Sequence, residues 1–157
     1  MTTVEFQSRH SVEQVEEGTG FAPKFGGDGL MPCITSDAQT SEVLMLGWMN
    51  EEALRLTIET GEAHYFSRAR QVLWHKGATS GLVQKVIDAR VDDDQDAIWL
   101  KVDVAGSGAS CHVGYRSCFY RSVPLAENAG QPLTFLEDQK VFDPSEVYGD
   151  APNPTQL

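Results

Sequence analysis

The chain has 157 residues, of which 41% are hydrophobic and 22% are charged, so we expect one globular domain with a single core. No apolar stretch approaches the ~18 residues of a membrane span, and the polar, acidic first 18 residues lack the apolar centre of a secretory signal. The net charge of −11 repels phosphate backbones and disfavours nucleic acid as a partner. We therefore expect a cytoplasmic protein without a membrane or nucleic-acid partner.

The two ends of the chain predict tails around one domain. Residues 1–18 are expected to form a polar tail or a short helix. Residues 143–157 contain three prolines and little apolar content, which is typical of a flexible C-terminal tail. The domain is therefore predicted to cover residues 19–142.

Within that domain, the first predicted elements are strands at 30–35 and 42–48, short apolar runs flanked by polar residues or glycine. The one clear helix follows. Asn50 is a preferred N-cap residue, and Gly61 suits the C-terminal stop. Residues 63–67 then predict a strand that leads into a basic, glycine-containing loop.

Two longer strands are predicted at 82–91 and 97–104, where apolar residues recur with a period of two. Glycines 106 and 108 predict a turn, and 119–125 predicts a further strand. Together these elements predict an α+β fold: a small, mostly antiparallel sheet domain with one or two helices.

The first group of candidate site residues is an acidic run at 92–96. In an extended segment, the carboxylates of Asp92, Asp94 and Asp96 point to one face at intervals of roughly 6–7 Å. Three such oxygen ligands suit Mg²⁺. The alternative is a solvated acidic turn between two strands, because runs of charge usually face water.

The second group is the pair Cys111 and Cys118, with His112 beside the first. An odd count of three cysteines argues against a disulfide framework. Two thiolates brought together can bind zinc if a third ligand comes from this chain or a second copy, and His112 can then carry protons. The alternatives are two unrelated buried cysteines and a structural histidine.

The third group is basic. Arg68 and Arg70 alternate near the end of a predicted strand, so both can face one phosphate. A glycine-containing loop follows, with hydroxyl and backbone donors for a second phosphate. The candidate substrate-binding residues are Ser67, Arg68, Arg70, Lys76, Thr79 and Ser80. The alternative is a basic hairpin that neutralises the acidic run.

The order and spacing of these groups resemble the phosphoribosyl-AMP cyclohydrolases of histidine biosynthesis. The resemblance covers nearly the whole core, from about Gly29 to Arg121. It is carried by Met49-Asn50-Glu51-Glu52-Ala53-Leu54, Tyr65-Phe66-Ser67-Arg68, Leu73-Trp74, Lys76-Gly77, Thr79-Ser80-Gly81, Gln84, the run from Asp92 to Ala97, and Cys111-His112 through Cys118-Phe119.

The resemblance implies an intertwined homodimer that hydrolyses N1-(5-phosphoribosyl)-AMP, opening the adenine ring between N1 and C6. It places magnesium on Asp92, Asp94 and Asp96, and zinc on Cys111 and Cys118 at the subunit interface. His112 is the candidate proton carrier for N1, with a metal-activated water attacking C6.

The chain departs from the family pattern at three positions. The family's Asp-Cys-Asp-x-Asp becomes Asp-Asp-Asp-Gln-Asp, so Asp93 replaces the third zinc ligand, a cysteine contributed by the other subunit. A carboxylate also binds zinc, but it favours harder metals such as Mn²⁺ or Fe²⁺. Ala78 replaces an acidic residue and Ala69 replaces a hydroxyl. Two further hypotheses follow: a divergent paralogue acting on another cyclic amidine or purine-like ring, and a non-catalytic metal-binding dimer.

Overall fold

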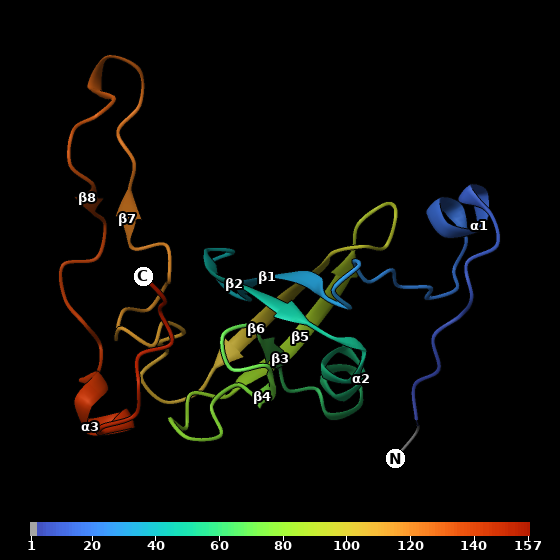
Figure 1. Cartoon of the computed structure of the whole chain (residues 1–157), viewed down its shortest axis with the longest axis horizontal. Helices are drawn as coiled ribbons and strands as arrows, with labels where there is room; N and C mark the ends of the chain where they lie inside the picture. The colour runs from blue at the N-terminus through green and yellow to red at the C-terminus, as the bar shows by residue number, and fades with distance from the viewer. Residues whose placement is uncertain (1–2) are drawn as a thin grey trace.

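The computed structural model describes residues 3–157 and is organised around a four-stranded sheet of order β2-β1-β6-β5. The strands are β1 (Met31–Asp37), β2 (Val43–Met49), β5 (Gln84–Val91) and β6 (Ile98–Val104). The four strands expected at these places are confirmed. β1–β2 and β5–β6 are antiparallel hairpins, which agrees with the mostly antiparallel sheet expected, but β1 and β6 pair in parallel, so the central sheet is mixed. Figure 1 shows the two hairpins side by side.

Helix α2 (Glu51–Thr60) follows β2 and confirms the predicted helix and both of its ends. The Asn50 side chain accepts a hydrogen bond from the backbone N–H of Ala53 at 2.8 Å, and Gly61 ends the helix at φ 72°, a conformation that glycine adopts without a steric penalty. The helix buries Ala53, Leu54 and Thr57 against the rest of the domain.

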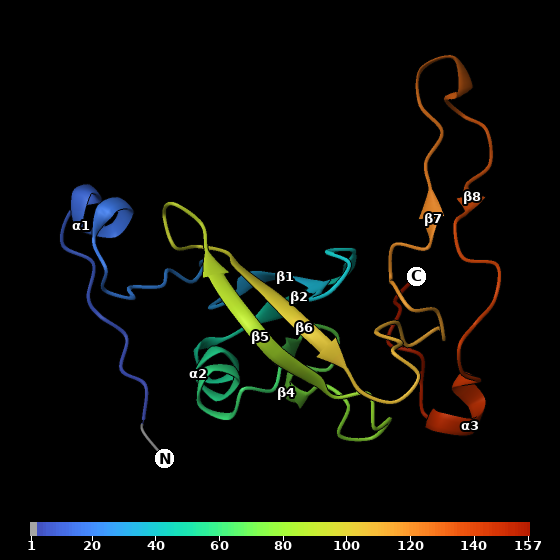
Figure 2. The same ribbon diagram turned by 180° about the vertical axis from the view of Figure 1, so that it is seen from behind.

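A third hairpin packs beside this helix. It consists of β3 (His64–Ser67), which the sequence predicted, and β4 (Val72–His75), which it did not. Helix α2 and this hairpin lie on one side of the sheet, and no helix of the described residues covers the other side (Figures 1 and 2). The core lies between them and contains Met31, Cys33, Leu44, Met45, Met49, Ala53, Leu54, Ala63, Tyr65, Ile98, Leu100 and Val102.

The remaining elements lie at the two ends of the chain. Helix α1 (Val12–Glu17) has a capping box made by Ser11 and Gln14. An extended arm carries β7 (Arg121–Ser122), the short 3-10 helix η1 (Ala126–Asn128) and β8 (Thr134–Phe135), and it projects away from the sheet (Figure 1). The strand predicted at 119–125 is thus only two residues long. Helix α3 (Pro144–Tyr148) follows the arm.

Among residues 3–157, no helix combines the length and the apolar character needed to cross a lipid bilayer.

Candidate metal centres and substrate cleft

The acidic run forms a tight turn between β5 and β6, which is the alternative given above to an extended segment. Asp92 closes the turn: its carboxylate accepts hydrogen bonds from the backbone N–H groups of Asp96 and Ala97, at 3.1 and 3.2 Å. Gln95 adopts φ 56°, in the left-handed region. As a result, each of Asp92, Asp94 and Asp96 offers an oxygen that lies within 4.8 Å of the others.

These three carboxylates form a site of concentrated negative charge. Hydrogen bonding to Asp94 and Asp92, together with their negative charges, raises the pKa of Asp96 to about 6. No ion pair found among the described residues involves this trio. Three converging carboxylate oxygens without a basic partner fit a hard divalent cation such as Mg²⁺.

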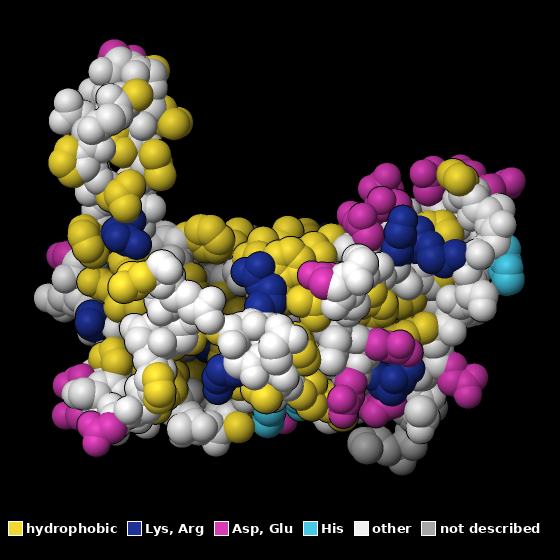
Figure 3. Space-filling model, viewed as in Figure 1, with side chains coloured by type: hydrophobic (Ala, Val, Ile, Leu, Met, Phe, Trp, Pro, Cys, Tyr) yellow, Lys and Arg dark blue, Asp and Glu magenta, His cyan; other side chains and the backbone are white. Residues whose placement is uncertain are grey.

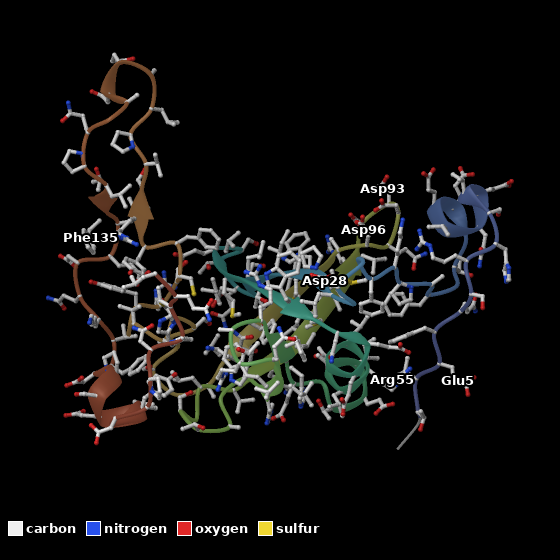
Figure 4. All side chains as sticks on the ribbon, in the orientation of Figure 1. Glu5, Asp28, Arg55, Asp93, Asp96 and Phe135 are labelled. Carbon is white, nitrogen blue, oxygen red and sulfur yellow. The ribbon has the colours of Figure 1, made fainter. Side chains whose placement is uncertain are left out.

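Asp93 lies in the same turn, but its side chain is exposed and is not part of the trio. Figure 4 labels it at the tip of the β5–β6 hairpin, where the chain is farthest from the sheet. A carboxylate in this position is accessible to another molecule.

Cys111 and Cys118 come together in the loop that follows β6. A hydrogen bond from Cys118 lowers the pKa of the Cys111 thiol to about 6, and the same interaction raises the pKa of Cys118. The backbone N–H of Cys118 is bound to the carbonyl of Leu44 at 2.7 Å, which ties the loop to β2. The two thiols are thus close enough for each to shift the pKa of the other. Two sulfur ligands alone do not complete a tetrahedral zinc site.

Lys76, which was expected to bind phosphate, lies next to these thiols. Its side chain is 3% exposed, and its ammonium donates a hydrogen bond to the carbonyl of Ser110 at 2.8 Å. Burial lowers the pKa of Lys76, while the sulfurs of Cys118 and Cys111 act in the opposite direction. The lysine thus provides positive charge that favours the Cys111 thiolate.

The acidic turn and the cysteine pair lie at opposite ends of the β5–β6 hairpin. Val91 pairs with Ile98 at the acidic end, and Gln84 pairs with Val104 at the other. The Gln84 side chain also bonds the hydroxyl of Ser110 at 3.1 Å, next to the first cysteine. Because β6 has seven residues, the two ends lie roughly 20 Å apart. Asp93 and the cysteines of one chain therefore cannot bind the same ion.

A cleft of about 330 Å³ opens between β2 and the β3–β4 hairpin. It is lined by Met45, Leu46, Gly47, Trp48, Tyr65, Phe66, Arg68, Trp74, His112, Pro154 and Thr155. The guanidinium of Arg68 lies 4.7 Å from the ring centre of Trp48. The Nε1 of Trp48 and the Nε2 of His112 are buried and find no hydrogen-bond partner in the described residues. Two such polar atoms in one cleft suit a polar ligand.

The similarity of this chain to known proteins covers most of the site residues described above. The profile of the family described as phosphoribosyl-AMP cyclohydrolase matches residues 45–120, which contain most of β2, most of the residues that line the cleft, the acidic turn and both cysteines. The chain is 53% identical over 138 residues to phosphoribosyl-AMP cyclohydrolase of Nitrobacter winogradskyi, covering 88% of this chain and 94% of that protein. It is 52% identical over 141 residues to phosphoribosyl-AMP cyclohydrolase of Bradyrhizobium diazoefficiens, covering 90% and 98%.

The chain belongs to the phosphoribosyl-AMP cyclohydrolase family. The resemblance noted in the sequence is thereby confirmed, and membership implies dependence on metal ions.

Of the remaining residues expected to bind substrate in this cyclohydrolase-family chain, none lines the cleft. The hydroxyl oxygen of Ser67 accepts hydrogen bonds from Arg70, whose guanidinium lies 5.8 Å from the ring centre of Trp74. Ser80 accepts a hydrogen bond from the backbone of Leu82 at 3.2 Å, and Thr79 is exposed. Of the predicted site residues, Arg68 and His112 line the cleft.

The aromatic walls of the cleft were not predicted as part of the site. Trp48 and Trp74 come from different hairpins, and Tyr65 closes the space between them. The available signal was the concentration of aromatic residues near the arginine-containing strand. The C-terminal Pro154 and Thr155 gave no local signal, since they reach the cleft only through the path of the folded chain.

Proposed function

We propose that this chain catalyses hydrolysis of N1-(5-phosphoribosyl)-AMP, opening the N1–C6 bond of its adenine ring in histidine biosynthesis. The observation that carries this proposal is the cleft, in which aromatic walls, an arginine and an unpartnered histidine nitrogen meet within the family-matched region. Both relatives named above are called phosphoribosyl-AMP cyclohydrolase, and the chain aligns with almost their full lengths.

The cleft residues suit the parts of this substrate. Trp48 and Trp74 offer apolar faces to a purine ring. Arg68 supplies positive charge for a phosphate at the rim, with Ser67, Arg70, Lys76, Thr79 and Ser80 as the other proposed phosphate and substrate contacts.

His112 is the proposed proton carrier. Burial lowers the pKa of His112, with the Asn153 side chain acting in the opposite direction, so the imidazole is neutral near pH 7 and can accept a proton and pass it on. In the proposed reaction it delivers that proton to N1 as the bond to C6 breaks. A bound metal ion supplies the Lewis acidity that makes water nucleophilic at neutral pH.

We assign magnesium to Asp92, Asp94 and Asp96, and zinc or a harder transition metal to Cys111 and Cys118. The converging oxygens of the trio and the lowered pKa of the Cys111 thiol beside Cys118 support these assignments. Asp93 is proposed as the third ligand of the cysteine site, contributed by a second copy of the chain. Its exposure at the hairpin tip supports that role.

A homodimer is the proposed assembly, because a second copy brings the tip of one hairpin to the cysteines of the other. The open face of the sheet supports it: Leu46, Ile34 and Trp99 are register neighbours across three strands, and the first two are 49% and 41% exposed. Figure 3 shows hydrophobic side chains gathered over β1 and β2. Such a continuous apolar patch is typical of an interface.

The arm adds a second apolar surface for the same partner. Its exposed side chains are Phe119, Val123, Leu125, Leu133, Phe135 and Leu136. A two-stranded hairpin is marginally stable alone in water, so contact with a second copy stabilises it.

The cytoplasm is the proposed compartment. Cys33, Cys111 and Cys118 are all free thiols, which is typical of proteins in a reducing compartment.

The activity is tested by following the ultraviolet absorbance of phosphoribosyl-AMP with purified protein and a panel of Zn²⁺, Mn²⁺, Fe²⁺ and Mg²⁺. Ring opening that requires a transition metal and Mg²⁺ supports the proposal. Absence of turnover with every metal, in folded protein that has bound metal, refutes it. Turnover of a different cyclic amidine instead would favour the paralogue hypothesis.

The shared metal site is tested by mixing two inactive variants, Asp93→Ala and Cys111→Ser. Random reassortment makes half of the dimers mixed, and each mixed dimer has one intact site, so the zinc content recovers to about a quarter of the wild-type value. Asp93→Cys provides the reference for tight binding. No recovery on mixing means that Asp93 is not a ligand contributed by the partner.

A further inference from the structure

We infer that residues 9–24, here called the N-terminal brace, hold the acidic turn in its metal-binding shape, with Gln95 and Arg9 as positioning residues. The inference rests on the proposed role of Asp92, Asp94 and Asp96 as magnesium ligands. Figures 1 and 2 both show α1, which belongs to the brace, beside the turn between β5 and β6.

Gln95 connects the turn to the brace through its side-chain amide and its backbone carbonyl. Its side chain is 4% exposed. The amide oxygen accepts from the N–H of Ala22 at 2.9 Å, and the amide nitrogen donates to the carbonyls of Val15 and Gly20 at 2.9 and 3.3 Å. The backbone carbonyl of Gln95 accepts from the N–H of Lys24 at 2.8 Å. The partners lie more than 70 positions earlier in the chain, so these bonds are tertiary contacts.

These bonds hold Gln95 in a conformation that a non-glycine residue rarely adopts. At φ 56° the residue lies in the left-handed region, which costs of order 1 kcal/mol or more and persists only where surrounding contacts enforce it. This backbone conformation reverses the chain between Asp94 and Asp96. Without the brace, repulsion between the carboxylates favours an extended run in which alternate side chains lie roughly 6–7 Å apart.

Arg9 clamps the same turn without neutralising it. One guanidinium nitrogen donates to the carbonyl of Ala22 at 2.6 Å, and the other donates to the backbone carbonyl of Asp94 at 2.8 Å. The arginine therefore binds a main-chain oxygen of the brace and a main-chain oxygen of the turn. Its positive charge lies close to the trio, yet the carboxylate of Asp94 remains available to a cation.

The brace is itself anchored at a second point, far from the turn. Phe6 packs edge-on against Phe21 at 5.4 Å, and the guanidinium of Arg55 lies 4.9 Å from the ring centre of Phe6. Arg55 also donates to the backbone carbonyl of Val4 at 3.1 Å. Figure 4 shows Arg55 beside Glu5, well away from Asp93 and Asp96. This arginine makes the same kind of bond as Arg9 and provides a matched control.

The test is a titration of the full chain with Mn²⁺ alone, followed by electron paramagnetic resonance, with unfolding measured in parallel by circular dichroism. The Mn²⁺ binding that is lost in Asp92→Asn is assigned to the trio of Asp92, Asp94 and Asp96. In Gln95→Ala and Arg9→Ala, the dissociation constant of that part is expected to rise about tenfold, the usual effect of removing a group that orients metal ligands. Arg55→Ala is expected to lower the unfolding temperature while leaving the Mn²⁺ dissociation constant unchanged.

Three results overturn specific parts of this account. If Asp92→Asn leaves Mn²⁺ binding intact, the proposed magnesium site is wrong. If Asp92→Asn abolishes binding while Arg9→Ala and Gln95→Ala bind like the wild type, the brace has no positioning role. If Arg55→Ala weakens binding as much as Arg9→Ala, the effect is general loosening of the segment. Should Gln95→Ala fail to fold, Arg9→Ala still decides the question, because its bonds are at the protein surface.

Discussion

Tyr65→Phe is the substitution that best tests how the sheet supports the cysteine loop. Tyr65 is 1% exposed, and its hydroxyl lies 2.7 Å from that of Thr35 and donates to the side-chain oxygen of Gln84 at 2.6 Å. Gln84 then donates to Ser110, the residue before Cys111. A single buried network therefore runs from the core sheet to the proposed metal ligands.

The expected loss of stability follows from this network. Phenylalanine keeps the ring, so no cavity forms, and the change is confined to hydrogen bonds. Two buried hydrogen bonds contribute about 1 kcal/mol each, and the unsatisfied oxygen of Gln84 adds about 1–3 kcal/mol, so the free energy of unfolding falls by about 3 kcal/mol or more. For a chain of this size, that corresponds to a decrease of about 6–12 °C in Tm.

The measurement is thermal and urea unfolding at one fixed protein concentration, because association shifts the apparent stability of a dimer. Tyr120→Phe is the matched control: its ring stacks on that of Tyr115 at 4.1 Å, and no side-chain hydrogen bond of its hydroxyl is found in the described structure. A loss in Tyr65→Phe below about 1 kcal/mol, or equal to the loss in Tyr120→Phe, would refute the proposed energetic role of the network.

Three other substitutions or measurements probe the cleft and the thiols. In Gly47→Ala the new Cβ would lie 2.6 Å from the ring of Tyr65, so we expect the free energy of unfolding to fall by about 1–3 kcal/mol and KM to rise. Gly27→Ala is the control: its Cβ would meet nothing within 4 Å, so neither quantity should change. His112→Gln should lower kcat by about 10²–10⁴-fold with little change in Tm, because Nε2 makes no internal hydrogen bond; a large fall in Tm would instead indicate a structural histidine. Alkylation of Cys111 in metal-free protein should rise through a pH of about 6, since the lowered pKa makes thiolate the main form above that pH; a rise only near pH ~8.5 would contradict the thiol pairing.

The parts of the fold that local sequence determines were predicted well. β1 and β2 follow from short apolar runs, β5 and β6 from alternating apolar residues, and the ends of α2 from Asn50 and Gly61. The parallel pairing of β1 with β6 was not foreseen, because it depends on where the chain returns after α2 and the β3–β4 hairpin. The short β4 strand was read as loop because a basic, glycine-containing segment surrounds it.

The site shows the same division between local and distant causes. The spacing of the acidic run and the family resemblance singled out Asp92, Asp94 and Asp96, whose oxygens converge in the structure. The sequence left the shape of this run open between an extended segment and an acidic turn. Glutamine carries no preference for the left-handed region, so nothing within the run indicates that Gln95 reverses the chain; the contacts that impose it come from residues 15–24.

The β5–β6 hairpin determines what one copy of the chain can and cannot assemble. It keeps the acidic turn and the cysteine loop roughly 20 Å apart, and the ladder between its strands is too rigid to fold one end onto the other. A dimer with a twofold axis would form two equivalent shared sites. If the axis places the hairpin tip of one chain at the cysteines of its partner, it also places the partner's hairpin tip at the cysteines of the first chain. Under the proposed assignment, metal binding and association therefore stabilise one another, and removing the metal lowers the affinity of the two chains for each other.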